Sequence, residues 1–371
     1  MTSQFVAPER HSAREINIRD LSSLAAAGLP AMFDAAQSLF CFRVRQVGAT
    51  LTREGISHRY TMMTLLGMHR QMGHGAAVPI DTESVFQSLT AKTDWIENIG
   101  DVGLLLWLSA EAFPQYLERL YRVLDPGSAL ERYQSRRETM HLAWFLAGCS
   151  HVAMAAKSEL PNTIDTALAA YRELVANQGI SGAFRHQSSQ GTVTGWLRGR
   201  VGTFADQVYP IYALSRMAQA YGMNEPLSRA LNCADVICGA QGPLGQWWWH
   251  YDSEKGSVLG RYPVYSVHQH AMGPMALLAL QEVSKRDYSD AIYHGLEWIE
   301  HKNELGCDMK DEAAKLVWRC IRPTPQLLTY TEDAAAFLGV RSWQIGRFNL
   351  TVLRECRPYE LGWLLYAFAG R

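Results

Sequence analysis

The strongest constraint on the fold is a sixfold alternation of two kinds of helical segment along 371 residues. The first kind carries an apolar stripe at helical spacing with charges opposite, as in DTALAAYRELVANQG. We expect it near residues 30–46, 82–92, 113–124, 161–177, 226–240 and 287–301. The second kind is apolar nearly all round, which is typical of a helix covered on both sides. It is expected near 58–71, 98–110, 137–156, 203–222, 267–284 and 358–370.

This alternation predicts an all-α fold, an (α/α)6 toroid of six helical hairpins with an outer and an inner ring of helices. A single core usually stops growing before this length, but in a closed ring each hairpin is buried against its neighbours. We therefore expect one domain over residues 1–371. Aromatic, Gly-rich loops at 179–202 and 241–266 and an insertion at 303–357 interrupt the pattern, and a further helix is expected over 311–322. Loops this long are usually functional, so we place them at one mouth of the ring.

Composition excludes several classes of protein. The 35 basic and 36 acidic residues nearly cancel, which argues against a nucleic-acid groove. The N-terminus has scattered charges and no apolar core, so no secretory signal is expected. Pro30 and Asp34 interrupt the apolar stretch 21–40 and argue against a membrane span. Seven cysteines without a CxxC pair predict reduced thiols in a cytoplasmic protein. Phosphate-loop, GxSxG and zinc-site patterns are absent, so we expect no cofactor and no metal.

Polar side chains recur at the N-terminal ends of the expected inner helices. If these helices run parallel, the ends converge at one mouth, where unpaired backbone N–H groups and positive dipole ends favour anionic ligands. For a single carboxylate, complementing the dipole of its own helix is an equally good explanation. The recurrence around the ring nevertheless predicts a pocket formed by Arg59, Tyr60, Asp101, Asp206, His268, His270, Arg357, Tyr359 and Glu360.

The segment GQWWWHYD, residues 245–252, is the most informative loop. Trp247, Trp248 and Trp249 are consecutive and cannot all face one core, so at least one is expected in the cavity. There an indole ring would stack on a sugar or stabilise a cation; a Trp-rich plug is the structural alternative. Asp252 would act as a general base or bind a hydroxyl. The further pocket residues expected from this region are His250, Tyr262 and Tyr265.

The segment GWLRGRVGTFADQVYP places Trp196, Arg198 and Arg200 before an inner helix. Two arginines there would bind a carboxylate or phosphate bidentately, or bridge loop carbonyls. His268 and His270 are expected as acid/base groups or pocket wall rather than as metal ligands, because no third ligand is suitably spaced. Glu360 with a second carboxylate would supply the pair that glycoside cleavage requires.

The stretch WLRGRVGTFADQVYPIYALSRMAQAYG and the loop GQWWWHYD resemble the six-hairpin glycosidase-like enzymes. This group includes unsaturated glucuronyl hydrolases, sugar 2-epimerases and related lyases. The element Trp196-Leu197-Arg198-Gly199 is similar to a W-x-R-G element of the hydrolases, whose second catalytic Asp motif is missing here. ALNCADVICGAQGPLGQWWWHYD also resembles the repeats of squalene-cyclase-like terpenoid cyclases, but their DxDD run is absent, as is the zinc-binding pattern of lanthionine-type cyclases.

These observations predict a carbohydrate-active enzyme that uses acid/base chemistry on a sugar or uronic-acid-containing oligosaccharide. Hydrolysis, elimination and epimerisation all use such parts. Asp206 and Asp252 are the expected acid/base pair, assisted by His268, His270 and Glu360. One alternative is a terpenoid cyclase-like enzyme whose aromatic residues stabilise an isoprenoid cation. Another is a non-catalytic binding protein, because one fold hosts many functions. Each interpretation expects a small-molecule partner.

Overall fold

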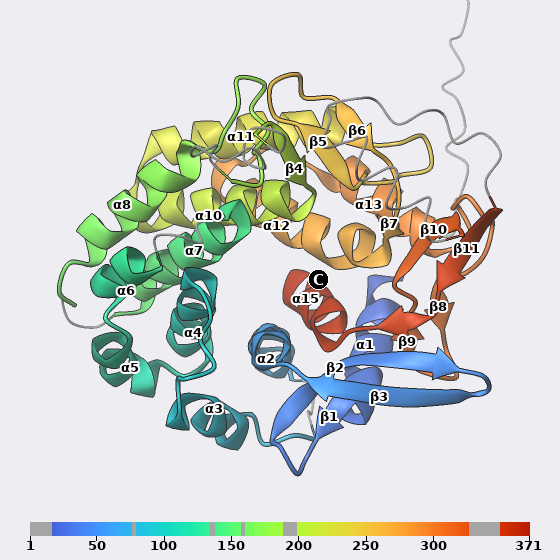
Figure 1. Cartoon of the computed structure of the whole chain (residues 1–371), viewed down its shortest axis with the longest axis horizontal. Coiled ribbons are helices and arrows are strands. Elements are labelled where there is room, and N and C mark those ends of the chain that lie inside the picture. Colours follow the sequence, from blue (N-terminus) through green and yellow to red (C-terminus); the bar gives the residue numbers. More distant parts are fainter. Residues whose placement is uncertain (1–16, 76–78, 134–137, 157–159, 188–198, 326–348) are drawn as a thin grey trace, which may run out of the picture.

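The helices form two concentric rings in the computed structural model, which describes residues 17–75, 79–133, 138–156, 160–187, 199–325 and 349–371 (Figure 1). The inner ring consists of α2 (His58–Gly73), α4 (Ile99–Ala112), α7 (Thr139–Ala155), α10 (Ala205–Tyr221), α12 (Gly273–Ser284) and α15 (Pro358–Phe368). Each inner helix packs against the next, and α15 packs against α2 to close the ring. The outer ring consists of α1 (Ile18–Met32), α3 (Thr82–Ala91), α5 (Leu117–Leu124), α6 (Pro126–Arg132), α8 (Thr163–Val175), α11 (Asn224–Gly239) and α13 (Ser289–Ile299). The predicted toroid is confirmed.

Burial follows the two kinds of sequence pattern. In the inner helix α4 every residue from Ile99 to Ala110 is buried. The outer helix α13 buries a stripe that includes Ile292, Leu296 and Ile299 and leaves its other face more open. Helices α4 and α7 touch through glycines: a Cβ at Gly103 would lie 2.3 Å from the Cα of Phe145. The small residues of the inner helices therefore set how closely the ring can pack.

The prediction of a helix over residues 30–46 was wrong. Helix α1 ends at Met32, and the chain continues as strands β1 (Phe33–Asp34), β2 (Leu39–Val47) and β3 (Thr50–Ile56). The stretch FCFRVRQV is rich in aromatic and β-branched residues, which pack well on a pleated sheet. Gly48, at φ +60, makes the tight turn that pairs Val47 with Thr50.

The prediction of a helix over residues 311–322 was also wrong. This stretch forms β8 (Lys310–Asp311), β9 (Leu316–Val317) and the start of β10 (Cys320–Thr324). The Asp311 carboxylate accepts a hydrogen bond from the Ala314 N–H, and Lys315 has φ +55. A side-chain-capped turn with a left-handed residue replaces the helix, because Asp bonds its own following backbone readily.

Short antiparallel sheets gather before the inner helices α10, α12 and α15. One joins β4 (Val201–Thr203), β5 (His250–Asp252) and β6 (Val258–Gly260). Another joins β7 (Val264–Tyr265), β10 and β11 (Asn349–Leu353), and β12 (Glu355–Cys356) pairs with β2. The loops 179–202 and 241–266 and the insertion 303–357 supply most of these strands. The candidates Trp196 and Arg198 lie outside the described residues.

All seven cysteines are free thiols. Of the helices that the structure describes, none is both long and apolar enough to cross a membrane.

Candidate functional site

A cavity of about 200 Å³ lies at the N-terminal ends of the inner helices. Helices α2, α7, α10 and α15 each contribute residues from their first or second turn, so these helices run parallel and their N-termini meet at one mouth. The remaining wall comes from the loop 241–266, from Val267 and the π-helical turn (His268–Met272) that lead into α12, and from Arg319 just before β10. The lining residues are Arg59, Tyr60, Met63, Met140, Trp144, Ala205, Tyr209, Trp249, Tyr265, Val267, His268, Met272, Arg319 and Tyr359.

Arg59 provides one positive charge at the cavity. Its Nε and Nη2 donate to the two carboxylate oxygens of Asp101, at 2.8 and 3.2 Å. Asp101 is buried in the first turn of α4 and also accepts from the Glu97 N–H at 3.1 Å. Because a guanidinium has five N–H donors and this pair uses two, Arg59 keeps donors for a ligand while Asp101 fixes its orientation.

Arg319 provides a second positive charge from the segment before β10. Its Nη1 donates to the carboxylate of Glu360, and its guanidinium lies 4.9 Å from the ring centroid of Tyr265. Glu360 is fully buried in the first turn of α15. Burial raises the pKa of Glu360, and the neighbouring Arg319 and Arg357 oppose that rise. Glu360 therefore positions Arg319 rather than lining the cavity itself.

Trp249, Tyr265 and His268 form an aromatic wall. The rings of Trp249 and His268 are stacked at 5.8 Å, and those of Tyr265 and His268 lie 5.2 Å apart. Burial lowers the pKa of His268 to about 3 and that of His270 to about 3. Both imidazoles are therefore uncharged near neutral pH, and His270 does not line the cavity. His268 offers a neutral hydrogen-bonding group rather than a cation.

Of the three consecutive tryptophans, Trp249 alone reaches this cavity. Trp247 is completely buried and stacks on Phe204 at 5.6 Å. Trp248 is 7% exposed, and its Nε1 donates to the carbonyl oxygen of Ala240 at 3.0 Å. Trp247 and Trp248 therefore pack the loop 241–266 against the inner ring. Among the other expected residues, His250 is buried in β5, and the Tyr262 hydroxyl donates to Glu304.

Asp206 lies beside the cavity in a cluster with two histidines and a glutamate. It is fully buried and accepts from the N–H and the hydroxyl of Thr203, each at 2.8 Å. Its Oδ2 lies 3.1 Å from Nδ1 of His186. The Nε2 of His186 lies 3.7 Å from Oε2 of Glu138, which lies 3.5 Å from Nδ1 of His141. His186 and Glu138 remain partly exposed, so the cluster connects a buried carboxylate to solvent.

Backbone hydrogen bonds hold His186 between strand β4 and the start of the inner helix α7. Its N–H donates to the carbonyl of Val201 in β4, and its carbonyl accepts from the N–H of Thr139 at the start of α7, both at 2.8 Å. Met140 directly follows Thr139 and Ala205 directly precedes Asp206, and both Met140 and Ala205 line the cavity. The sequence did not indicate Glu138 or His186 as site residues, because only the fold brings them to Asp206.

Asp252 has a different environment. It is fully buried, and its Oδ1 accepts from the N–H groups of Glu254 and Lys255 at 2.9 and 3.2 Å. Its Oδ2 lies 3.5 Å from Nε of Arg200. These contacts close the turn between β5 and β6. Asp252 does not line the cavity. It pairs with Val201, the first residue of β4, whereas Thr203, which binds Asp206, is the last.

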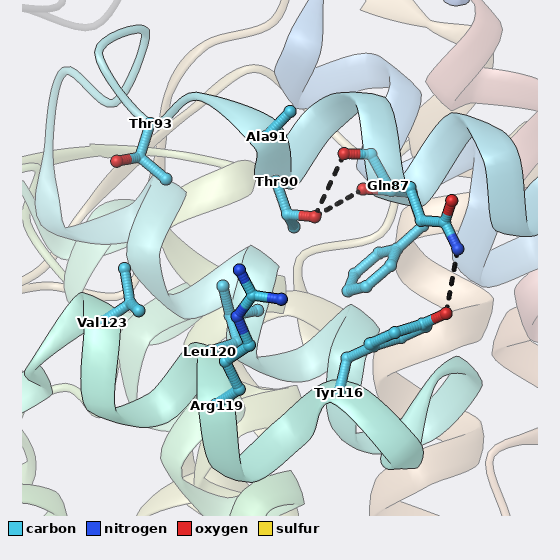
Figure 2. Close-up of a pocket in the computed structure, with 9 residues that line it drawn as sticks. Gln87, Thr90, Ala91, Thr93, Tyr116, Arg119, Leu120 and Val123 are labelled. Atoms are coloured by element: carbon cyan, nitrogen blue, oxygen red, sulfur yellow. Dashed lines mark hydrogen bonds between the residues drawn. The ribbon is translucent and has the colours of Figure 1, made fainter.

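A second pocket, of about 430 Å³, lies on the outside of the toroid between α3 and α5 (Figure 2). Arg119 extends from α5 toward α3, and Gln87 donates to the hydroxyl of Tyr116 at 2.9 Å (Figure 2). Its lining has no carboxylate or histidine. The axial cavity differs in that His268 lines it and the cluster of Asp206, His186 and Glu138 lies next to its lining residues Met140 and Ala205. No group of three or more metal-ligating side chains is found within the described part of the chain.

No protein-family model matches the sequence, and no curated protein is similar to it. Solved structures are similar in fold. An unsaturated glucuronyl hydrolase specific for heparin has 12% identity and a TM-score of 0.58, with 94% of this chain and 95% of that chain covered. A possible member of the GH105 family from Salmonella enterica has 11% identity and a TM-score of 0.59, covering 98% and 95%. A glycosyl hydrolase family 88 protein from Bacteroides vulgatus has 9% identity and a TM-score of 0.55, covering 95% and 97%. The resemblance to six-hairpin glycosidase-like enzymes is thus confirmed at the level of the fold.

Proposed function

We propose that the protein is a carbohydrate-active enzyme that binds an acidic sugar ring in the axial cavity and transfers protons to or from it. The observation that carries this proposal is the composition of the wall: aromatic rings together with the guanidinium groups of Arg59 and Arg319. Aromatic faces suit the C–H face of a sugar, and guanidinium binds a carboxylate with two parallel hydrogen bonds. The similar folds include glycoside hydrolases, one of them a glucuronyl hydrolase, which supports a uronic-acid-type substrate.

The proton-transfer group in this proposal is His186, with Asp206 behind it. A buried carboxylate that accepts from one ring nitrogen fixes the tautomer of the imidazole and stabilises its protonated form. Asp206 has this relation to Nδ1, which leaves Nε2 facing Glu138 and solvent. His186 and Glu138 do not line the cavity itself; in this proposal one of them exchanges a proton with a part of the substrate that extends past Met140 and Ala205. Asp252, the expected partner of Asp206, takes no part in this proposal, because its carboxylate accepts the backbone hydrogen bonds of the β5–β6 turn.

The same parts serve hydrolysis, elimination and epimerisation, and product analysis distinguishes these reactions. The terpenoid cyclase alternative requires a mostly apolar cavity with a single proton donor. Two guanidinium groups at the wall are unfavourable next to a hydrocarbon chain, because the N–H donors that Asp101 and Glu360 do not use would lose hydration without gaining an acceptor. The charged wall therefore favours an acidic sugar over an isoprenoid.

The test is a thermal-shift panel with glucuronic acid, glucuronic-acid-containing disaccharides, neutral disaccharides and prenyl diphosphates. A ligand at a hundred times its dissociation constant adds about 2.7 kcal/mol of stability. We expect acidic sugars to raise the melting temperature, and Arg59→Gln or Trp249→Ala to abolish that rise. Trp95→Ala, outside the cavity, is the matched control for the tryptophan. Stabilisation by prenyl diphosphates alone would overturn the proposal.

Any sugar that binds is then incubated with wild-type protein, His186→Gln and Asp206→Asn, and the products are analysed by mass spectrometry. We expect both variants to bind the sugar and to lose turnover by at least about 100-fold, the usual contribution of a general acid or base. Full activity in His186→Gln would remove His186 from the mechanism while leaving the binding proposal intact.

A further inference from the structure

Phe42, on β2, is an aromatic side chain that remains 37% exposed beside the cavity. Its ring stacks on Tyr60, with centroids 5.5 Å apart and planes inclined by 20°. Tyr60 in turn packs against Tyr359 at 4.6 Å. Tyr60 and Tyr359 both line the cavity. The three rings therefore form a continuous aromatic strip from the cavity wall to the surface.

Arg357 holds this strip in place. Its guanidinium lies 4.6 Å from the ring centroid of Phe42, and its Nη1 donates to the Tyr60 hydroxyl at 2.8 Å. Its Nε donates to Glu355 at 2.9 Å, which ties it to β12. The side chain of Arg357 is 19% exposed. The outer end of the strip thus combines a fixed aromatic face with a cation that reaches solvent.

The neighbouring strand leaves Phe42 uncovered. Gly55 of β3 lies opposite it, between the registered pairs Cys41 with Ile56 and Arg43 with Glu54. Gly55 has φ +61, and a Cβ at this position would lie 3.3 Å from the Cβ of Phe42. Glycine adopts this conformation without strain and places no side chain over the ring.

We infer that the strip of Phe42, Tyr60 and Tyr359 is a second sugar subsite, so that the substrate is an oligosaccharide of at least two rings. This inference rests on the proposed function. A cavity of about 200 Å³ is smaller than the roughly 300–1,000 Å³ of sites for drug-sized molecules, so it accommodates one ring and directs the next one to the mouth. There an exposed aromatic face stacks on a sugar ring. A single exposed apolar residue needs no explanation, but Phe42 differs from Leu51 of the same hairpin because it stacks on the cavity wall.

The experiment compares Phe42→Ala with Leu51→Ala, a variant of the same hairpin whose side chain is 45% exposed. Isothermal titration measures the affinities for glucuronic acid and for a disaccharide of glucuronic acid and N-acetylglucosamine. An aromatic contact contributes about 0.5–1.5 kcal/mol. We therefore expect Phe42→Ala to weaken disaccharide binding about 2- to 10-fold and to leave glucuronic acid binding unchanged. Phe42→Trp should restore disaccharide affinity, and Leu51→Ala should change neither.

Two outcomes would overturn the subsite and leave the proposed function in place. One is unchanged disaccharide affinity in Phe42→Ala. The other is an equal loss for both ligands, because that places the effect in the cavity through Tyr60. If neither sugar binds the wild-type protein, the proposed function itself fails, and the subsite fails with it.

Discussion

Three fully or almost fully buried histidines, His151, His268 and His270, make the stability of the toroid sensitive to acid. Burial lowers the pKa of each to about 3. In the unfolded chain a histidine has a pKa of about 6.5. Below pH 6.5 the unfolded chain therefore binds a proton at each of these positions that the native protein does not take up. Their contribution to stability is complete above pH 6.5 and is lost as the pH falls from 6.5 toward 3.

The size of the loss follows from the same difference in pKa. At one pH unit below 6.5, each histidine lowers the free energy of unfolding by about 1.4 kcal/mol, and the three together lower it by about 4 kcal/mol. A typical domain is stable by about 5–15 kcal/mol. We therefore expect the free energy of unfolding, measured in urea, to fall by about 4 kcal/mol between pH 7.5 and pH 5.5, and acid unfolding to begin near pH 5.

His270 is the best position for the test, since neither ring nitrogen hydrogen-bonds to another residue that the structure describes. His270→Leu should reduce the fall between pH 7.5 and pH 5.5 by about 1.4 kcal/mol. His301→Asn is the matched control, because the His301 side chain is 67% exposed and should leave the fall unchanged. An identical fall in wild-type protein and His270→Leu would refute the assignment of acid sensitivity to this buried imidazole.

Two further predictions concern the packing of the inner ring. Arg70→Met should lower the free energy of unfolding, measured in urea, by roughly 3 kcal/mol. It removes the cation that binds Glu111 at 2.6 Å. The value is at the low end for a buried pair because Arg70 is 30% exposed. The exposed pair of Arg229 with Glu225 should contribute less than about 1 kcal/mol, so Arg229→Met is the control. Gly103→Ala should cost about 3 kcal/mol or more in thermal melts, because its Cβ would overlap the backbone of α7, whereas Gly73→Ala meets nothing within 4 Å and should be neutral or stabilising.

The inner helices were predictable because their signal is local. The segment expected over 137–156 forms α7 (Thr139–Ala155), and that expected over 203–222 forms α10 (Ala205–Tyr221). A long run of apolar residues without strand-breaking turns leaves few alternatives to a buried helix. The β2–β3 hairpin was not predicted, because a short apolar stretch fits a helical stripe as well as a strand. Its pairing with β12 depends on residues near the other end of the chain.

The site was only partly predictable for a related reason. Tyr60, Trp249, Tyr265, His268 and Tyr359 were expected at the pocket and do line the cavity. Their positions follow from local sequence signals, because each lies at or just before the start of an inner helix or in the aromatic loop.

Arg319 was missed because it was assigned to a helix. Its place at the cavity depends on the ladder between β10 and β7, in which Cys320 pairs with Tyr265. His186 and Glu138 were missed because their partner, Asp206, is close only in space. Residues whose role depends on long-range pairing carry no pattern in their immediate neighbourhood.

The two ends of the inner ring use similar side chains for different purposes. At the C-terminal ends, the Tyr366 hydroxyl donates to Glu111 at 2.7 Å and lies 2.6 Å from the Tyr212 hydroxyl. Arg70 and His151 complete this network, so its polar groups are largely satisfied by one another. Such a network stabilises one arrangement of the helices because each group that loses its partner costs free energy. At the N-terminal ends, the carboxylates orient arginines that still face a cavity. Because the helices run parallel, a satisfied polar network can occupy one end of the ring while the arginines and aromatic rings that line the cavity stand at the other.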